Sequence, residues 1–253
     1  MAQEGGANAT ARHRRLTAWN EPQRLAAGES RFLSFAKVIC HCSYDGGWGE
    51  CIAMPDETRL AIATPHGVVR AIYHPAEGAT GAVVLVSGAL GGVAGPSGAY
   101  PALARRLQAA RSAALRLDYR KPGSMNECVY DVDAGLDELR HRGVKQFAVI
   151  GWSFGGAVAI RSGVAHSDVL GVATLASQTA GADAVSRLAP RSLLLLHGTA
   201  DQVLPDWCSR YLYEEASEPK RLVLCDGDGH EFSRSRAEVV QILFEWADAL
   251  LAQ

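Results

Sequence analysis

The chain has 253 residues, of which 48% are hydrophobic and 21% are charged, and its formal net charge is −2. This balance is typical of a globular protein with a real core, and the length fits one α/β domain. The near-neutral charge gives no electrostatic reason to expect nucleic acid or an anionic membrane surface as a partner.

The first part of the chain is a poor candidate for folding. Residues 1–30 are rich in Gly, Ala and Arg without a lasting hydrophobic period, so we expect a disordered tail. Residues 31–60 form an N-terminal extension whose packing the sequence leaves open, because Phe32–Cys40 has enough apolar side chains for a packed strand or helix. The folded domain is expected over residues 61–253.

The first thirty residues also bear on the cellular location of the protein. Residues 1–30 contain no apolar run like that of a secretory signal peptide, and we expect a cytoplasmic protein. Arginines in a head with few acidic residues leave an organelle transit peptide as an alternative, although Glu4, Glu21 and Glu29 count against it. A start of translation at Met54 is a third interpretation, since every recognisable motif follows that residue.

The cysteines are scattered, and we expect reduced thiols rather than a disulfide framework. One group, Cys40-His41-Cys42 followed by Cys51, looks like a metal cluster at first sight. Its spacing matches no common zinc pattern, and no second CxxC or HxxxH completes it. The sequence therefore predicts no metal site. The remaining cysteines are Cys128, Cys208 and Cys225.

The stretch from Gly78 to Ala104 carries no charge and is long enough to cross a bilayer. It also holds seven glycines together with Pro96 and Pro101, a density of helix breakers that a lipid-exposed helix would not tolerate. We therefore expect a buried strand, a glycine-rich loop and the start of a helix, and no membrane span.

From residue 60 onward, short apolar runs alternate with helical periods. One such period places Val239, Leu243, Trp246 and Leu250 on a single stripe. This alternation predicts a mostly parallel sheet covered by helices on both faces. The expected strands are Val68–Tyr73, Ala82–Val86, Ala114–Leu117, Phe147–Ile150, Leu170–Leu175, Ser192–Leu196 and Arg221–Cys225.

The main chemical motif is Gly151-Trp152-Ser153-Phe154-Gly155, which links an apolar strand to a helix of small residues. A G-x-S-x-G motif in this setting is typical of a strained turn that exposes a nucleophilic serine. The glycines allow the turn and helix to approach the sheet closely. We therefore assign Ser153 as the nucleophile.

A serine hydroxyl needs a base to take its proton, and the base needs a carboxylate to orient it. His230 lies in a glycine-rich turn between the last strand and the C-terminal helix, whereas His197 ends a strand and is expected to be packed or hydrogen-bonded there. Asp201 follows that strand in His197-Gly-Thr-Ala-Asp201. We assign His230 as base and Asp201 as acid; the rival acids are Asp206, Asp226 and Asp228.

Acyl transfer also needs N–H donors for the oxyanion. One is the backbone N–H of Phe154, directly after the nucleophile. The second is expected from the glycine-rich loop Ser87–Gly92, with Ala89 the first candidate and Leu90 the alternate. This loop is no phosphate cradle, because it has neither a G-K-[ST] ending nor the G-x-G-x-x-G order.

Together these motifs, from about Ala61 to Leu251, make the chain resemble the α/β-hydrolase family, and within it small members related to dienelactone hydrolases and carboxylesterases. The resemblance implies a serine hydrolase that cleaves a carboxylic ester or thioester through an acyl-enzyme, without a cofactor. Dienelactone hydrolases use cysteine where Ser153 stands, so a lactone substrate does not follow. The interval from Ser177 to Arg191 leaves room for a minimal cap domain or none.

Other functions remain open. An acyltransferase or a perhydrolase could use the same triad with another acceptor, and a non-catalytic binding protein could keep the fold. The sequence does not give the oligomeric state or the acyl-chain length. Candidate residues lining the site, each as compatible with a structural role, are Asp118, Tyr119, Arg120, Ser177, Gln178 and Trp207.

Overall fold

The computed structural model describes residues 38–40, 51–53 and 57–252. The first two segments form a short antiparallel pair, β1 (Val38–Cys40) and β2 (Cys51–Ala53). The expected tail, the start at Met54 and the side chains of the Cys-His-Cys cluster lie outside the described residues.

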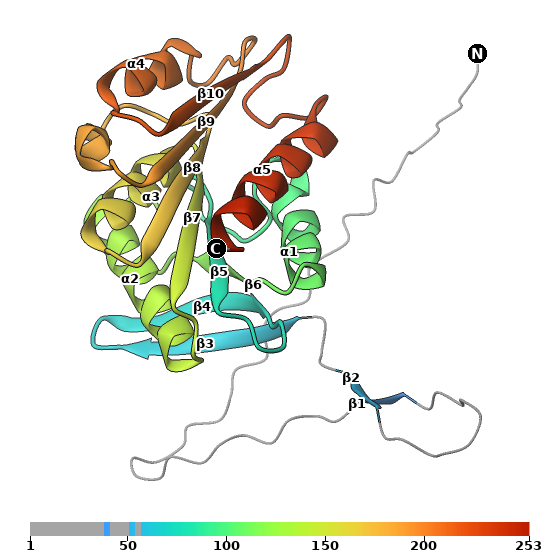
Figure 1. The fold of residues 1–253 in the computed structure, drawn as a ribbon. Helices are drawn as coiled ribbons and strands as arrows, with labels where there is room; N and C mark the ends of the chain where they lie inside the picture. Colours follow the sequence, from blue (N-terminus) through green and yellow to red (C-terminus); the bar gives the residue numbers. More distant parts are fainter. Residues whose placement is uncertain (1–37, 41–50, 54–56, 253) are drawn as a thin grey trace, which may run out of the picture. The chain divides into compact units, whose positions relative to one another are not determined.

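Residues 57–252 form a sheet of eight strands with the order β10-β9-β8-β7-β5-β6-β4-β3 (Figure 1). The neighbouring strands in the series β10-β9-β8-β7-β5-β6 pair in parallel. Strand β4 pairs antiparallel with both β6 and β3. The strands are β3 (Thr58–Thr64), β4 (Gly67–His74), β5 (Gly81–Val86), β6 (Ala113–Asp118), β7 (Gln146–Trp152), β8 (Val169–Leu175), β9 (Ser192–Gly198) and β10 (Lys220–Cys225).

Each expected strand is present within two residues of its predicted ends. The strand that sequence analysis missed is β3, which begins at Thr58, three residues before the expected domain start at 61. It is an edge strand whose side chains are mostly exposed or half-buried, so it lacks the continuous apolar run of the buried strands.

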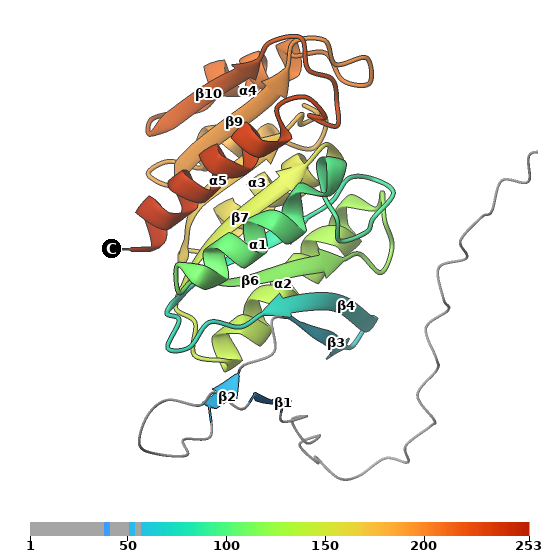
Figure 2. The ribbon, with the colours of Figure 1, turned by 90° about the vertical axis from the view of Figure 1, so that its right-hand side faces the viewer.

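Helices cover both faces of the sheet, as predicted (Figures 1 and 2). The helices α1 (Ala99–Ala109) and α5 (Arg236–Leu251) pack on one face, and their buried side chains share a core with inward residues of β5, β8 and β9. The other face is covered by α2 (Met125–His141), α3 (Phe154–Ala165) and α4 (Trp207–Glu215). Each face therefore has its own hydrophobic core, which holds the strand ends rigidly.

The strand order of the sheet reverses at β5, because the next two strands of the chain, β6 and β7, lie on opposite sides of it. Through α1 the chain leads from β5 to β6, and through α2 it crosses to β7, which pairs with β5 on its other side. The loops after β5 and β7 therefore leave the sheet at a topological switch point. In open parallel sheets, ligands bind in the crevice outside the carboxyl ends of the strands at such a point.

Little chain is available to cover that crevice. The segment between β8 and β9 contains one short 3₁₀ helix, η2 (Asp183–Arg187), and another, η1 (Pro96–Gly98), precedes α1. No cap domain is inserted between β8 and β9, as predicted from the interval 177–191. Within residues 38–40, 51–53 and 57–252, no helix is long and apolar enough to cross a membrane.

Candidate functional site

Ser153 lies in a strained turn at the switch point. It follows β7 directly and caps α3 with φ 58° and ψ −123°, a conformation that side-chain-bearing residues rarely adopt. Its backbone N–H donates to the carbonyl of Leu175 at the end of β8, 2.7 Å away. The neighbouring strand thus holds the turn in a geometry that presents the side chain at the strand ends.

The glycines of the motif are required by close contacts. A Cβ on Gly151 would lie 2.0 Å from the carbonyl oxygen of Gly155, and a Cβ on Gly155 would lie 2.3 Å from that of Ser87. On Gly156 it would lie 2.4 Å from the hydroxyl of Ser177. These distances are far below van der Waals contact, so the turn, α3 and the loop after β5 can pack together only with glycine here.

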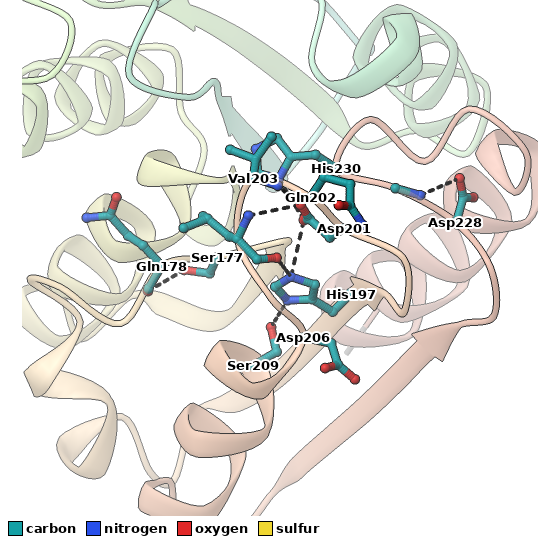
Figure 3. Close-up of polar contacts among 12 residues, drawn as sticks. Ser177, Gln178, His197, Asp201, Gln202, Val203, Asp206, Ser209, Asp228 and His230 are labelled. Carbon is teal, nitrogen blue, oxygen red and sulfur yellow. Dashed lines mark hydrogen bonds and ion pairs between the residues drawn. The ribbon is translucent and has the colours of Figure 1, made fainter.

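His230 and Asp201 contact each other in the loops that follow β10 and β9. His230 Nδ1 and Asp201 Oδ2 are 2.7 Å apart, although the residues are 29 positions apart in the chain (Figure 3). The other oxygen, Oδ1, accepts the N–H groups of Val203 and Leu204 at 2.8 and 2.9 Å. The carboxylate is therefore fixed by its own turn, with one oxygen left to face the imidazole.

The surroundings of Asp201 favour its charged form. Burial opposes ionisation, but the hydrogen bonds from His230 and from the backbone of Leu204 and Val203 outweigh it, so the pKa of Asp201 lies below its usual value. An ionised carboxylate can keep an imidazole in one orientation and stabilise the imidazolium that forms when the ring takes a proton.

The rival acids are engaged elsewhere. Both oxygens of Asp228 accept hydrogen bonds near the start of α5, including the N–H of Ser235 at 2.8 Å and the Ser235 hydroxyl. Asp226 accepts the hydroxyl of Thr199 at 3.2 Å, and Asp206 pairs with Arg210. The geometry therefore favours Asp201, whose role as the acid remains a prediction.

Sequence analysis missed the residue that ties the histidine loop to the nucleophile turn. The indole N–H of Trp152 donates to the backbone carbonyl of His230 at 3.1 Å, and the two rings lie 5.4 Å apart. Since Trp152 directly precedes Ser153, this bond holds the loop of the base against the turn of the nucleophile. The sequence pattern carries no signal for this contact, because it joins two residues that are 78 positions apart in the chain.

The expected oxyanion donors lie around the same turn. Ala89 and Leu90 are exposed in the loop after β5, while Phe154 is the first residue of α3. A Cβ on Gly88 would lie 3.4 Å from the Cβ of Ser153, so the backbone that leads into Ala89 lies against the nucleophile. Which N–H groups bind an oxyanion stays a prediction.

The candidate lining residues differ in burial and in their contacts. Arg120 forms ion pairs with Asp131 and Glu127. Asp118 accepts the N–H of Gly92 at 2.9 Å, so both side chains stabilise neighbouring parts of the fold. Trp207 is 55% exposed at the start of α4 and is free to contact a ligand. The others are Tyr119 and Ser177, which are buried, and Gln178, which is half-buried.

Two surface cavities lie away from these residues. One, of about 490 Å³, lies between β3 and α2 and is lined by Ile62, Tyr130 and His141 among others. The second, of about 480 Å³, is lined by residues such as Leu170, Pro219 and Trp246 near the amino ends of β8 to β10. Neither of these two cavities is lined by Ser153, Asp201 or His230.

In the described part of the chain, no group of three or more His, Cys, Asp or Glu side chains is arranged to hold a metal ion. Cys128, Cys208 and Cys225 are buried free thiols. The candidate residues would thus supply a hydroxyl, an imidazole, a carboxylate and backbone N–H groups, a set suited to nucleophilic attack on an acyl group.

Comparison with known sequences gives a partial match. No family model matches the chain. It is 30% identical over 126 residues to the uncharacterized protein YfhR of Escherichia coli, and the match covers 40% of this chain and 44% of that protein. The chain therefore spans less than half the length of the curated relatives it matches.

Solved structures give a much fuller match. The chain is similar to a dienelactone hydrolase from Anabaena variabilis with a TM-score of 0.70 and 21% identity, covering 78% of this chain and 99% of that one. Its similarity to Est1E from Butyrivibrio proteoclasticus has a TM-score of 0.68 at 14% identity, covering 77% and 99% of the two chains. For the α/β hydrolase GrgF from a Penicillium species the TM-score is 0.65 at 14% identity, with 79% and 100% covered. The chain has the α/β-hydrolase fold, which confirms the expected resemblance at the level of the fold.

Proposed function

We propose that this protein is a serine hydrolase that cleaves a carboxylic ester or thioester. The observation that carries the proposal is the 2.7 Å hydrogen bond between His230 and Asp201 at the edge where Ser153 occupies a strained turn. The α/β-hydrolase fold of dienelactone hydrolases and esterases supports it.

In the first half of the reaction, Ser153 Oγ attacks the carbonyl carbon of the substrate while His230 Nε2 takes the hydroxyl proton. Asp201 stabilises the imidazolium through Nδ1. The N–H groups of Phe154 and Ala89 are proposed to bind the oxyanion, with Leu90 as the alternate donor. When the tetrahedral intermediate collapses, His230 returns the proton to the departing alcohol or thiol.

In the second half, His230 takes a proton from water, which attacks the acyl-enzyme and releases the acid and the free serine. No cofactor enters either half. The depressed pKa of Asp201 keeps its carboxylate ionised throughout the neutral range, as this mechanism requires.

The open edge favours a small or extended acyl group. Three large apolar side chains are exposed in the segments that follow the strands: Leu90 in the loop after β5, Val203 in the loop after β9, and Trp207 at the start of α4. We propose that they contact the apolar part of the substrate, since exposed apolar residues close to a reactive centre are typical of ligand sites.

The alternatives use the same geometry differently. An acyltransferase or perhydrolase would pass the acyl group to another acceptor, and a binding protein would use the fold without the chemistry. The short η2 segment leaves the edge open to water, which favours hydrolysis. A complete hydrogen-bonded acid and base beside the serine turn favours an enzyme.

The direct test is hydrolysis of a panel of short and long acyl esters and thioesters by the wild-type protein and by Ser153→Ala. We expect the variant to melt like the wild type and to lose about 10⁴- to 10⁶-fold in kcat. Near-normal hydrolysis by the variant would exclude Ser153 as the nucleophile, and adding competing alcohol acceptors would reveal a transferase.

A further inference from the structure

A second histidine contacts the acid of the proposed triad. His197 Nε2 lies 3.3 Å from Asp201 Oδ2, the same oxygen that faces His230, and both the His197 and the Asp201 side chains are fully buried. Figure 3 shows the series of contacts from His230 through Asp201 to His197 and Ser209. The triad carboxylate thus lies between two imidazoles.

The hydrogen bonds of His197 determine which of its nitrogens carries the proton. Nε2 is 2.9 Å from the carbonyl oxygen of Leu204, which can only accept, so Nε2 must bear the hydrogen. Nδ1 then accepts the hydroxyl proton of Ser209 at 2.7 Å. Burial lowers the pKa of His197, so the ring is neutral at neutral pH and its contact with Asp201 is an N–H dipole rather than an ion pair.

The two acceptors of this N–H belong to one turn. Asp201 begins the turn, and its Oδ1 accepts the N–H groups of Val203 and Leu204. The His197 Nε2–H group reaches the carbonyl of Leu204 and lies beside Asp201 Oδ2. One N–H group therefore bonds to the far end of the turn and lies beside the carboxylate at its beginning.

We propose that His197 is a positioning residue for the reaction proposed above: its Nε2–H group holds the Asp201 turn and the orientation of the carboxylate that orients His230. The proposal rests on that function. Its second consequence is electrostatic, because an N–H dipole 3.3 Å from the carboxylate oxygen weakens the attraction of that oxygen for a neighbouring imidazolium. Loss of His197 should therefore change the pH dependence of the reaction.

Two conservative substitutions separate this role from simple packing. In His197→Gln the side-chain amide nitrogen takes the place of Nε2, so that an N–H group can still donate to Leu204 and lie beside Asp201. In His197→Asn the shorter amide reaches only the position of Nδ1, so the bond with Ser209 can persist while the donor toward Asp201 is lost. A matched control is His166→Asn, since His166 also pairs with an aspartate, Asp133, at 2.8 Å but far from the site.

We expect His197→Asn to lower kcat by about ten- to a hundred-fold with little change in KM, because the N–H group that bonds to Leu204 and lies beside the Asp201 carboxylate is lost. The acid limb of its kcat/KM profile should move to higher pH by about half a unit or more. His197→Gln should restore kcat to within about threefold of the wild type, and His166→Asn should change neither kcat nor the pH profile. Equal kcat values and unchanged pH profiles for the Asn and Gln variants would overturn the proposal.

If the Asn variant fails to fold, nitrogen NMR of the wild-type imidazoles decides the matter. We expect His197 to remain the neutral Nε2–H tautomer at neutral pH, and an Nδ1–H tautomer or an imidazolium there would overturn the proposal. Ser153→Ala in the same assay separates the two claims. If that variant stays active, the proposed function fails; if only Ser153→Ala and not His197→Asn loses activity, the role of His197 fails alone.

Discussion

The turns after β9 and β10 lie side by side and each carries a buried aspartate. In the turn after β9, Asp201 leaves one oxygen for the imidazole of His230. In the turn after β10, Asp228 is two residues from His230. Its Oδ1 accepts the N–H groups of Gly229 and Arg234, and its Oδ2 accepts the N–H and the hydroxyl of Ser235. Asp228 therefore stabilises the loop that carries His230, whereas the carboxylate that faces the imidazole is Asp201, which follows the neighbouring strand β9.

The largest expected effect is on catalysis. Asp201→Asn should lower kcat by about 10⁴-fold, because an amide cannot stabilise the imidazolium or hold the required tautomer. Asp228→Asn should keep most of the activity, since its carboxylate faces backbone N–H groups rather than the base. Ester hydrolysis by the two purified variants measures the difference, and greater damage from Asp228→Asn would reverse the assignment.

The two turns also contact each other at Gly198, and a change there should disturb both. A Cβ on this residue would lie 2.3 Å from the carbonyl oxygen of Asp228. Gly198→Ala should therefore lower the free energy of unfolding by several kcal/mol and reduce activity. Gly229→Ala, which would meet no atom within 4 Å, is the matched control for denaturant unfolding. If Gly198→Ala and Gly229→Ala have equal free energies of unfolding, Gly198 does not pack tightly against the backbone of Asp228.

Stability should depend on pH through Asp228. Its hydrogen bonds near Ser235 outweigh the cost of burial and hold its pKa below the ordinary 3.8, so ionised Asp228 favours the folded state. That contribution is present above about pH 4 and is lost as the pH falls through the lowered pKa. Asp228→Asn should thus be destabilised by about 1–3 kcal/mol at neutral pH. Denaturant unfolding of the wild type and of Asp228→Asn at pH 7 and pH 3 checks this prediction. If the difference in unfolding free energy between the two proteins is not smaller at pH 3 than at pH 7, the prediction is contradicted.

The smallest expected effect concerns the head of the chain. A chain shortened to begin at Met54 keeps all of β3, which pairs with β4 from Thr58 to Thr64, and it keeps Glu57, whose carboxylate lies 2.9 Å from Arg116. We expect a melting temperature within a few degrees of the full chain and equal esterase activity. Collapse of the shortened chain would mean that part of residues 31–53 belongs to the core.

The sequence predicted the features that depend on local pattern. Buried parallel strands are continuous apolar runs, and the nucleophile turn needs glycines at fixed places, so β5, β7 and the setting of Ser153 could be predicted. The edge strand β3 could not, because only alternate residues face inward, and alanines at two of its exposed positions, Ala61 and Ala63, weaken the contrast between polar and apolar residues. The contacts of Trp152 and His197 depend on how separate loops meet in space, which no local pattern encodes.

The central claim is that Ser153 is an activated nucleophile. A fluorophosphonate probe forms a stable bond with such a serine, and peptide mass spectrometry locates the modified residue. We predict one label per chain on Ser153, none on Ser153→Ala, and much slower labelling of Asp201→Asn. Absence of labelling in the folded wild-type protein, or a label on another residue that persists in Ser153→Ala, would contradict the account.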